Sequence, residues 1–86
     1  MKDRFIVYSN AAAITPSDSA IITPTPFELW ISTGAGATGI KVDTLGGQTV
    51  TFPLAASLVS RLPVMVTRIY ATGTALGTGG AVFGLW

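Results

Sequence analysis

The stretch Ile40-Lys-Val-Asp-Thr-Leu-Gly-Gly-Gln-Thr-Val-Thr-Phe52 decides the fold. Apolar and polar residues alternate on both sides of Gly46 and Gly47, which is typical of two strands that each bury one face. Two adjacent glycines can supply the positive φ values that a two-residue hairpin turn requires. The stretch therefore predicts paired antiparallel strands over 40–45 and 48–52. It also predicts positive φ at Gly46 and Gly47, with Lys41 and Asp43 pointing outward.

The flanking sequence also has the pattern of strands and turns. Residues 27–32 alternate again, so that Phe27, Leu29 and Ile31 share one face and Glu28, Trp30 and Ser32 share the other. No window of 11 or more residues keeps a helical period without a Gly or Pro. The remaining elements that we expect are strands over 11–15, 62–71 and 80–86, a short edge strand or connector over 20–23, and a helical turn or loop over 54–60.

These elements define the fold class. Six or seven short strands, with a turn about every 8–12 residues, predict an all-β fold: a small antiparallel β-sandwich or jelly-roll-like barrel. The 86 residues suffice for one domain. Residues 1–10 carry three of the nine charges and are expected to form an N-terminal arm, whereas residues 11–86 are expected to form a single β-sandwich domain.

The composition argues against catalysis. The chain has no His and no Cys, which removes the commonest general base, the commonest metal ligand and the thiol nucleophile. Acid–base work needs two carboxyl groups held together with divergent pKa values. No local spacing pairs the four carboxylates Asp3, Asp18, Glu28 and Asp43. We therefore expect no enzyme activity, no catalytic residue, no cofactor and no metal site.

Two local patterns have a functional and a structural interpretation. Gly34-x-Gly36-x-x-Gly39 matches the dinucleotide-binding fingerprint, but that site needs a following helix, and here a strand pattern follows. The sequence therefore favours a glycine-rich loop between strands. Asp18 lies between Ser17 and Ser19, where its side chain is expected to stabilise a turn, because one carboxylate makes a poor cation site.

Charge and hydropathy limit the possible partners. The net charge is +1 and only 10% of residues are charged, which argues against a nucleic-acid binder with a clustered basic face. Residues 69–86 form an uncharged run of 18, but its five glycines disfavour a spanning helix, so no membrane segment is expected. The four-residue apolar run Phe5–Tyr8 is shorter than a signal peptide requires, and no export signal is expected.

A surface this poor in charge is typical of a protomer buried against other subunits. The 80–86 strand carries neither a charge nor a Pro that would protect an exposed edge. Aromatic and Arg side chains are favoured at interfaces. The residues that we expect at an oligomer or partner interface are Phe5, Tyr8, Trp30, Arg68, Tyr70 and Trp86.

An ordered set of segments resembles a known family. The segments are Ile14-Thr-Pro-Ser-Asp-Ser19, Thr44-x-Gly-Gly-x-Thr-Val-Thr-Phe52, Leu62-Pro-Val-x-Val66 with Arg68, Ala71-Thr-Gly-Thr74 and the terminal Leu85-Trp86. In this order and spacing they are similar to the head-spike base proteins of gene transfer agents and related tailed bacteriophages. The likeness spans residues 11–86.

The resemblance implies a structural virion protein at the capsid vertices that links the capsid to a spike fibre. Its implied partners are its own copies, in a homo-oligomer that would be a pentamer, the major capsid protein and the spike fibre protein. It also implies synthesis in the bacterial cytoplasm and residence on the capsid surface. Two alternatives remain at this stage: a capsid cement protein or tail or baseplate adaptor, and a carbohydrate-binding module that contacts the host surface through its exposed aromatics.

Overall fold

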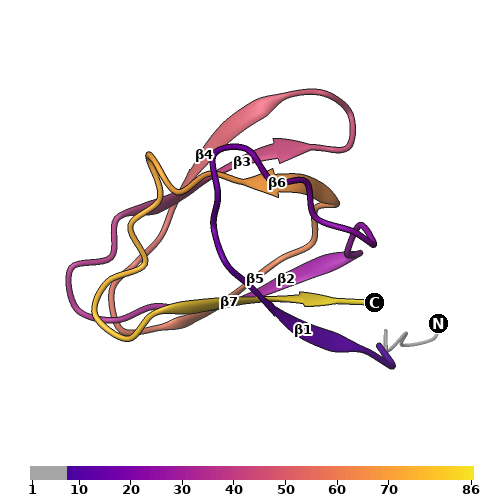
Figure 1. The fold of residues 1–86 in the computed structure, drawn as a ribbon. Coiled ribbons are helices and arrows are strands. Elements are labelled where there is room, and N and C mark those ends of the chain that lie inside the picture. Colours follow the sequence, from indigo (N-terminus) through magenta and orange to yellow (C-terminus); the bar gives the residue numbers. More distant parts are fainter. Residues whose placement is uncertain (1–7) are drawn as a thin grey trace, which may run out of the picture.

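A computed structural model describes residues 8–86 as seven strands and no helix, arranged in two facing sheets (Figure 1). Phe5 and most of the expected arm lie outside the described residues. The all-β sandwich predicted from the sequence is confirmed. The strands are β1 (Ala11–Ile14), β2 (Glu28–Ser32), β3 (Gly39–Thr44), β4 (Thr49–Pro53), β5 (Val59–Leu62), β6 (Val66–Ile69) and β7 (Ala81–Leu85).

All strand pairs are antiparallel. The four-stranded sheet, here sheet A, has the order β1-β7-β2-β5, and the three-stranded sheet B has the order β4-β3-β6. The last strand in sequence, β7, therefore lies in the middle of sheet A, between β1 and β2. Each sheet combines strands from distant parts of the chain.

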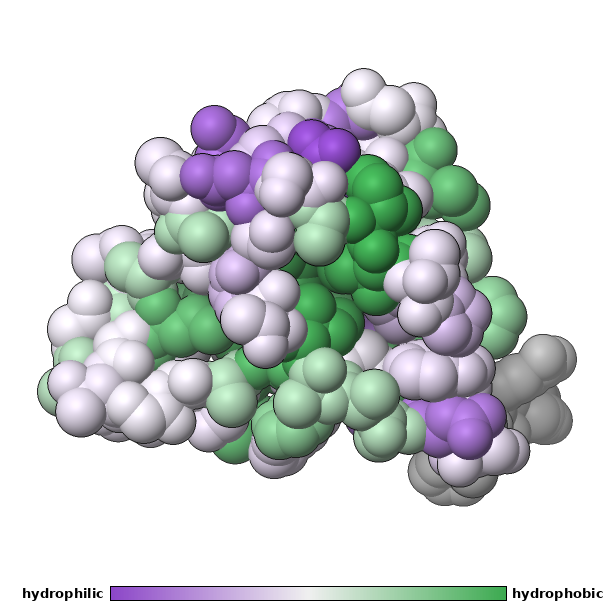
Figure 2. Space-filling view, viewed as in Figure 1, coloured by the Kyte–Doolittle hydropathy of each residue, from purple (hydrophilic) through white to green (hydrophobic). Residues whose placement is uncertain are grey.

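The core lies between the two sheets. Burying each aliphatic side chain here contributes about 1.5–3 kcal/mol relative to leaving it exposed. Hydrophobic side chains also reach the surface between the sheets on the side shown in Figure 2. The fully buried aliphatic residues are Leu29, Ile31, Ile40, Val42, Val66, Ile69 and Val82.

The alternation predicted for residues 27–32 is correct for the strand itself but wrong at its start. Leu29 and Ile31 are 0% exposed, as expected. Phe27 precedes β2 and is 55% exposed, so it does not join the core. Glu28 was expected on the outer face, where it lies, but it is buried there by neighbouring side chains, 7% exposed.

The predicted hairpin is present with a different turn. Strands β3 and β4 pair in the expected phase, with Val42 opposite Val50, and Lys41 and Asp43 point outward. Thr44 N–H donates to the carbonyl of Gln48, which closes a three-residue loop, and only Gly47 has a positive φ, 93°. A three-residue loop of this kind needs a left-handed residue at its last position alone. The prediction of a two-residue turn with positive φ at Gly46 is therefore wrong.

The long strand predicted over 62–71 is wrong. Pro63 cannot donate to a ladder, and Val64 N–H instead donates to the carbonyl of Leu62 across a tight turn at 2.8 Å. The chain changes sheet at this point, so β5 belongs to sheet A and β6 to sheet B. Residues 20–23 form a connector, which is one of the two forms expected there. Residues 54–58 form a loop, but residues 59–60, expected in the same helical turn or loop, belong to β5.

Two glycine-containing loops pack backbone against backbone at one end of the sandwich. Gly34 N–H donates to the carbonyl of Leu76, and Thr78 N–H donates to the carbonyl of Ala35. A Cβ placed on Gly34 would lie 1.8 Å from the carbonyl oxygen of Thr78, so there is no room for a side chain at this position. The Gly34-x-Gly36-x-x-Gly39 pattern thus serves close loop packing before β3, as the strand pattern predicted.

Candidate functional site

The outer face of sheet A carries a row of side chains in register across all four strands. Trp30 of β2 lies opposite Phe83 of β7 and Arg61 of β5, and Phe83 lies opposite Ala13 of β1. The rings of Trp30 and Phe83 have centroids 5.9 Å apart in a tilted arrangement, and Trp30 remains 37% exposed. This row presents a partly exposed aromatic surface on the outer face of sheet A.

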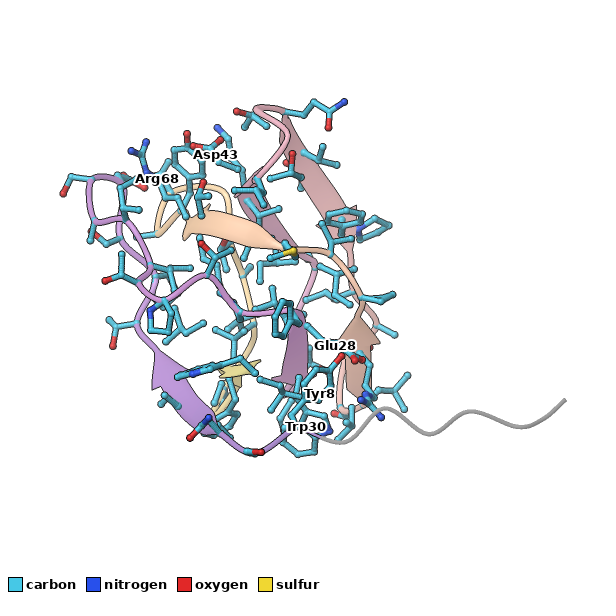
Figure 3. All side chains as sticks on the ribbon, turned by 90° about the vertical axis from the view of Figure 1, so that its right-hand side faces the viewer. Tyr8, Glu28, Trp30, Asp43 and Arg68 are labelled. Atoms are coloured by element: carbon cyan, nitrogen blue, oxygen red, sulfur yellow. The ribbon has the colours of Figure 1, made fainter. Side chains whose placement is uncertain are left out.

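A buried carboxylate borders this aromatic surface. Glu28 accepts hydrogen bonds from Nε and Nη2 of Arg61, at 2.7 and 3.0 Å, and from the hydroxyl of Tyr8 at 2.9 Å. The Tyr8 ring stacks on Phe27 with centroids 6.4 Å apart. Desolvation and the bond to Glu28 raise the pKa of the Tyr8 hydroxyl. Figure 3 shows Tyr8, Glu28 and Trp30 together on one side of the molecule.

The outer face of sheet B carries a separate polar cluster around Asp43. The Asp43 carboxylate accepts hydrogen bonds from Thr49 at 2.6 Å and from the Tyr70 hydroxyl at 2.7 Å, and Arg68 Nη1 lies 3.6 Å away. The Tyr70 ring has Lys41 Nζ 4.9 Å and the Arg68 guanidinium 5.5 Å from its centroid. The bond from Thr49, followed by that from Tyr70, lowers the pKa of Asp43. Figure 3 shows Asp43 and Arg68 side by side, far from Trp30.

The residues expected at a partner interface therefore lie on three surfaces and not on one. Tyr8 and Trp30 lie on the outer face of sheet A, whereas Arg68 and Tyr70 lie in the polar cluster of sheet B. Trp86 lines an open groove between the two sheets. Their role in assembly stays a prediction, and Phe5 lies outside the described residues.

Sequence reasoning missed two polar contacts between distant segments. Asp18 was expected to stabilise its own turn, but its carboxylate accepts hydrogen bonds from the backbone and hydroxyl of Thr72, at 2.9 and 2.6 Å. Ser17 stabilises that turn instead, accepting from Ser19 and Ala20. The second missed contact is the pair of Glu28 and Arg61. The one available signal was a carboxylate in an apolar strand, which requires a partner.

Other site classes receive no support from the part of the chain that the structure describes. Among residues 8–86, no three His, Cys, Asp or Glu side chains gather where they could hold a metal ion. In the same residues there is no helix of the length and hydropathy that a membrane span needs.

The comparisons with known proteins point to a particle shell. The chain is similar to a chain of the solved structure described as "Capsid of native GTA particle computed with C5 symmetry", with a TM-score of 0.70 and 29% sequence identity. The alignment covers 93% of this chain and 84% of that chain. No family model and no curated protein matches the chain. The likeness in both sequence and fold supports a structural protein of a gene transfer agent or phage particle.

Proposed function

We propose that this chain is a structural virion protein, and specifically a head-spike base that sits at the fivefold vertices of a capsid and holds a spike fibre. The observation that carries the proposal is the likeness to a chain of a gene transfer agent capsid over 93% of the sequence. That particle was computed with C5 symmetry. The proposed assembly is a homopentamer, and its proposed partners are the major capsid protein and the spike fibre protein.

The surface of the molecule suits such a role. The outer face of sheet A carries the rings of Trp30 and Phe83, and Trp30 is 37% exposed. An exposed cluster of large apolar side chains marks a surface that binds another protein. The outer face of sheet B is polar and suits contact with solvent or with a charged partner. The proposed role needs contacts and not chemistry, and we propose no enzymatic activity.

The experiment is cryo-electron microscopy of particles produced with and without this chain. We expect difference density at the fivefold vertices, with five copies at each, and loss of the spike fibre from particles that lack the chain. Density at every lattice site would instead identify a cement protein, and density at the tail would identify an adaptor. Either result would overturn the vertex assignment.

A matched variant links the density to the aromatic surface. Trp30→Ala should keep the fold, because the side chain lies outside the core, but should reduce vertex occupancy. Thr51→Ala on the edge strand of sheet B is the control and should leave occupancy unchanged. A glycan array with the purified chain tests the carbohydrate-binding alternative; specific glycan binding that Trp30→Ala abolishes, without vertex density, would favour that function.

A further inference from the structure

The Arg68 guanidinium is half-buried and yet makes a single hydrogen bond within residues 8–86. Its side chain is 25% exposed, and the bond runs from Nη1 to the Tyr70 hydroxyl at 3.5 Å, which is long for such a contact. The Asp43 carboxylate lies 3.6 Å from Nη1, too far for a hydrogen bond. Nε is buried without a partner. Because an arginine carries five N–H donors, most of the donors of Arg68 are unused.

Lys41 is a second cation on the same face of sheet B. Its Nζ lies 4.9 Å from the centroid of the Tyr70 ring, and the Arg68 guanidinium lies 5.5 Å from that centroid. Neither of the two ion pairs in residues 8–86 includes Lys41. One aromatic ring therefore holds two positive charges on the outer face of sheet B, and a cation–π contact does not neutralise either of them.

The carboxylate between these cations is bonded to other donors. Asp43 Oδ1 accepts a hydrogen bond from the Thr49 hydroxyl at 2.6 Å, and Oδ2 accepts one from the Tyr70 hydroxyl at 2.7 Å. These two bonds, in that order, lower the pKa of Asp43 more than Arg68 and Lys41 do. The cations thus outnumber Asp43, and neither is its main partner.

The free donors suit a carboxylate, because hydrogen bonds between a cation and a carboxylate are among the strongest in proteins. The described part of the chain has none to offer to a second copy. Asp18 accepts hydrogen bonds from Thr72 on both oxygens, and Glu28 accepts them from Arg61 on both oxygens. The remaining acidic side chain in the sequence is Asp3, outside the described residues. A partner for these cations is therefore to be sought on another protein.

We propose that Lys41 and Arg68 bind an acidic side chain of the capsid shell, so that the outer face of sheet B docks on the shell; this rests on the proposed vertex position. Arg68 supplies the planar fork that binds a carboxylate, and Lys41 adds a second positive charge. The shell is the partner that a vertex position requires whether or not a fibre is attached. The aromatic surface of sheet A lies far from these cations and stays free for other contacts (Figure 3).

The experiment measures rebinding of the purified chain to shells from particles produced without it. Arg68→Gln and Lys41→Gln each remove one charge and should each weaken binding about tenfold or more, because the carboxylate loses a charge-assisted partner. Arg68→Lys, which keeps the charge but loses the fork, should fall between the parent and Arg68→Gln. Raising the ionic strength from about 0.1 M to about 1 M shortens the Debye length from about 10 Å to about 3 Å, and should weaken binding of the parent more than binding of Arg68→Gln.

Two matched controls separate this contact from other effects of charge. Lys2→Gln removes the same net charge at a position that precedes the described residues, and should leave binding unchanged. Asp3→Asn removes the acidic side chain that a neighbouring copy could offer, and should also leave binding unchanged. The melting temperature of free Arg68→Gln should stay within about 5 °C of the parent, because Arg68 makes no short hydrogen bond in the free chain.

Four results would overturn the inference: Arg68→Gln and Lys41→Gln chains that bind as tightly as the parent, an equal loss for Lys2→Gln, a loss for Asp3→Asn, or a large fall in the melting temperature of Arg68→Gln. The third would assign the contact to a neighbouring copy and the fourth a structural role to Arg68. Unchanged rebinding of Arg68→Gln with loss of the spike fibre would assign the cations to the fibre and equally overturn it.

The proposed vertex role is judged separately. A parent chain that does not bind the shell would contradict both proposals. Fivefold density that persists with Arg68→Gln and Lys41→Gln would keep the vertex role and remove this inference alone.

Discussion

Nε and Nη2 of Arg61 both donate hydrogen bonds to the Glu28 carboxylate, although Arg61 lies opposite Trp30 and not Glu28 in the register of β2 and β5. This diagonal pair leaves Glu28 7% exposed, while the Arg61 side chain remains 53% exposed. Arg61→Ala should therefore lower the free energy of unfolding by about 1–2 kcal/mol, because among residues 8–86 it leaves the buried carboxylate with Tyr8 as its one remaining side-chain partner. Urea denaturation measures this, and Arg61→Lys, which keeps the charge but loses the fork, should fall between the two. Equal midpoints for all three chains would contradict the prediction.

The close approach of two loops leaves no room for a side chain at Gly34. Gly34→Ala should lower the free energy of unfolding by about 2 kcal/mol or more, because its methyl group would collide with the backbone of Thr78. Gly36→Ala in the same loop is the control; it has a φ of 87° but no atom within 4 Å of the added carbon, so it should cost about 1 kcal/mol. Thermal denaturation followed by circular dichroism ranks the two. A milder effect at Gly34 than at Gly36 would argue against the loop packing.

The two neighbouring glycines of the hairpin between β3 and β4 should differ in how well they tolerate a larger side chain. Gly47→Val should destabilise the fold by about 1 kcal/mol or more, because a β-branched residue resists a φ of 93°. Gly46→Val should cost less, since Gly46 has no positive φ and its nearest neighbours lie at ordinary contact distances of 3.7 Å or more. The melting temperatures of the two variants test this prediction. Equal decreases for Gly46→Val and Gly47→Val would support the two-residue turn predicted from the sequence.

Two carboxylates, the exposed Asp18 and the half-buried Asp43, should make the fold sensitive to acid. Hydrogen bonds from Thr72 to Asp18, and from Thr49 and Tyr70 to Asp43, hold the pKa of both groups below the usual 3.8. A carboxyl group with a lowered pKa in the folded state stabilises that state at neutral pH and loses the contribution as pH falls through the folded pKa. The melting temperature should therefore be nearly constant from pH 7 to about pH 5 and fall below about pH 4. The double variant Asp18→Asn, Asp43→Asn should be less stable at pH 7 and show a smaller decline; a profile as steep as that of the parent would exclude these two groups.

Alternation in the sequence was sufficient to predict the fold class and much of the core. Leu29 and Ile31, and Ile40 and Val42, are buried as their period of two indicates, because a strand places alternate side chains on opposite faces. The same rule failed at Phe27, which precedes the paired part of β2 and stacks on Tyr8. The end of a strand depends on its partners, and those partners are far away in sequence.

The candidate surfaces were less predictable than the core. The sequence indicated that Trp30 would point outward, but not that Phe83 and Arg61 would flank it, because strand order and register arise from contacts between distant segments. Pro63 was present in the strand predicted over 62–71, and a proline within a strand pattern is a reason to divide it. The polar cluster of Asp43, Arg68 and Tyr70 required the pairing of β3 with β6.

The central position of β7 has a consequence for biosynthesis. Chains emerge from the ribosome amino end first. Strand β1 pairs only with β7 among the described strands, so it stays unpaired until residues 81–85 have been synthesised and released from the exit tunnel. Sheet B, whose three strands end at Ile69, can form earlier. A nascent chain therefore cannot complete sheet A until β7 has been synthesised.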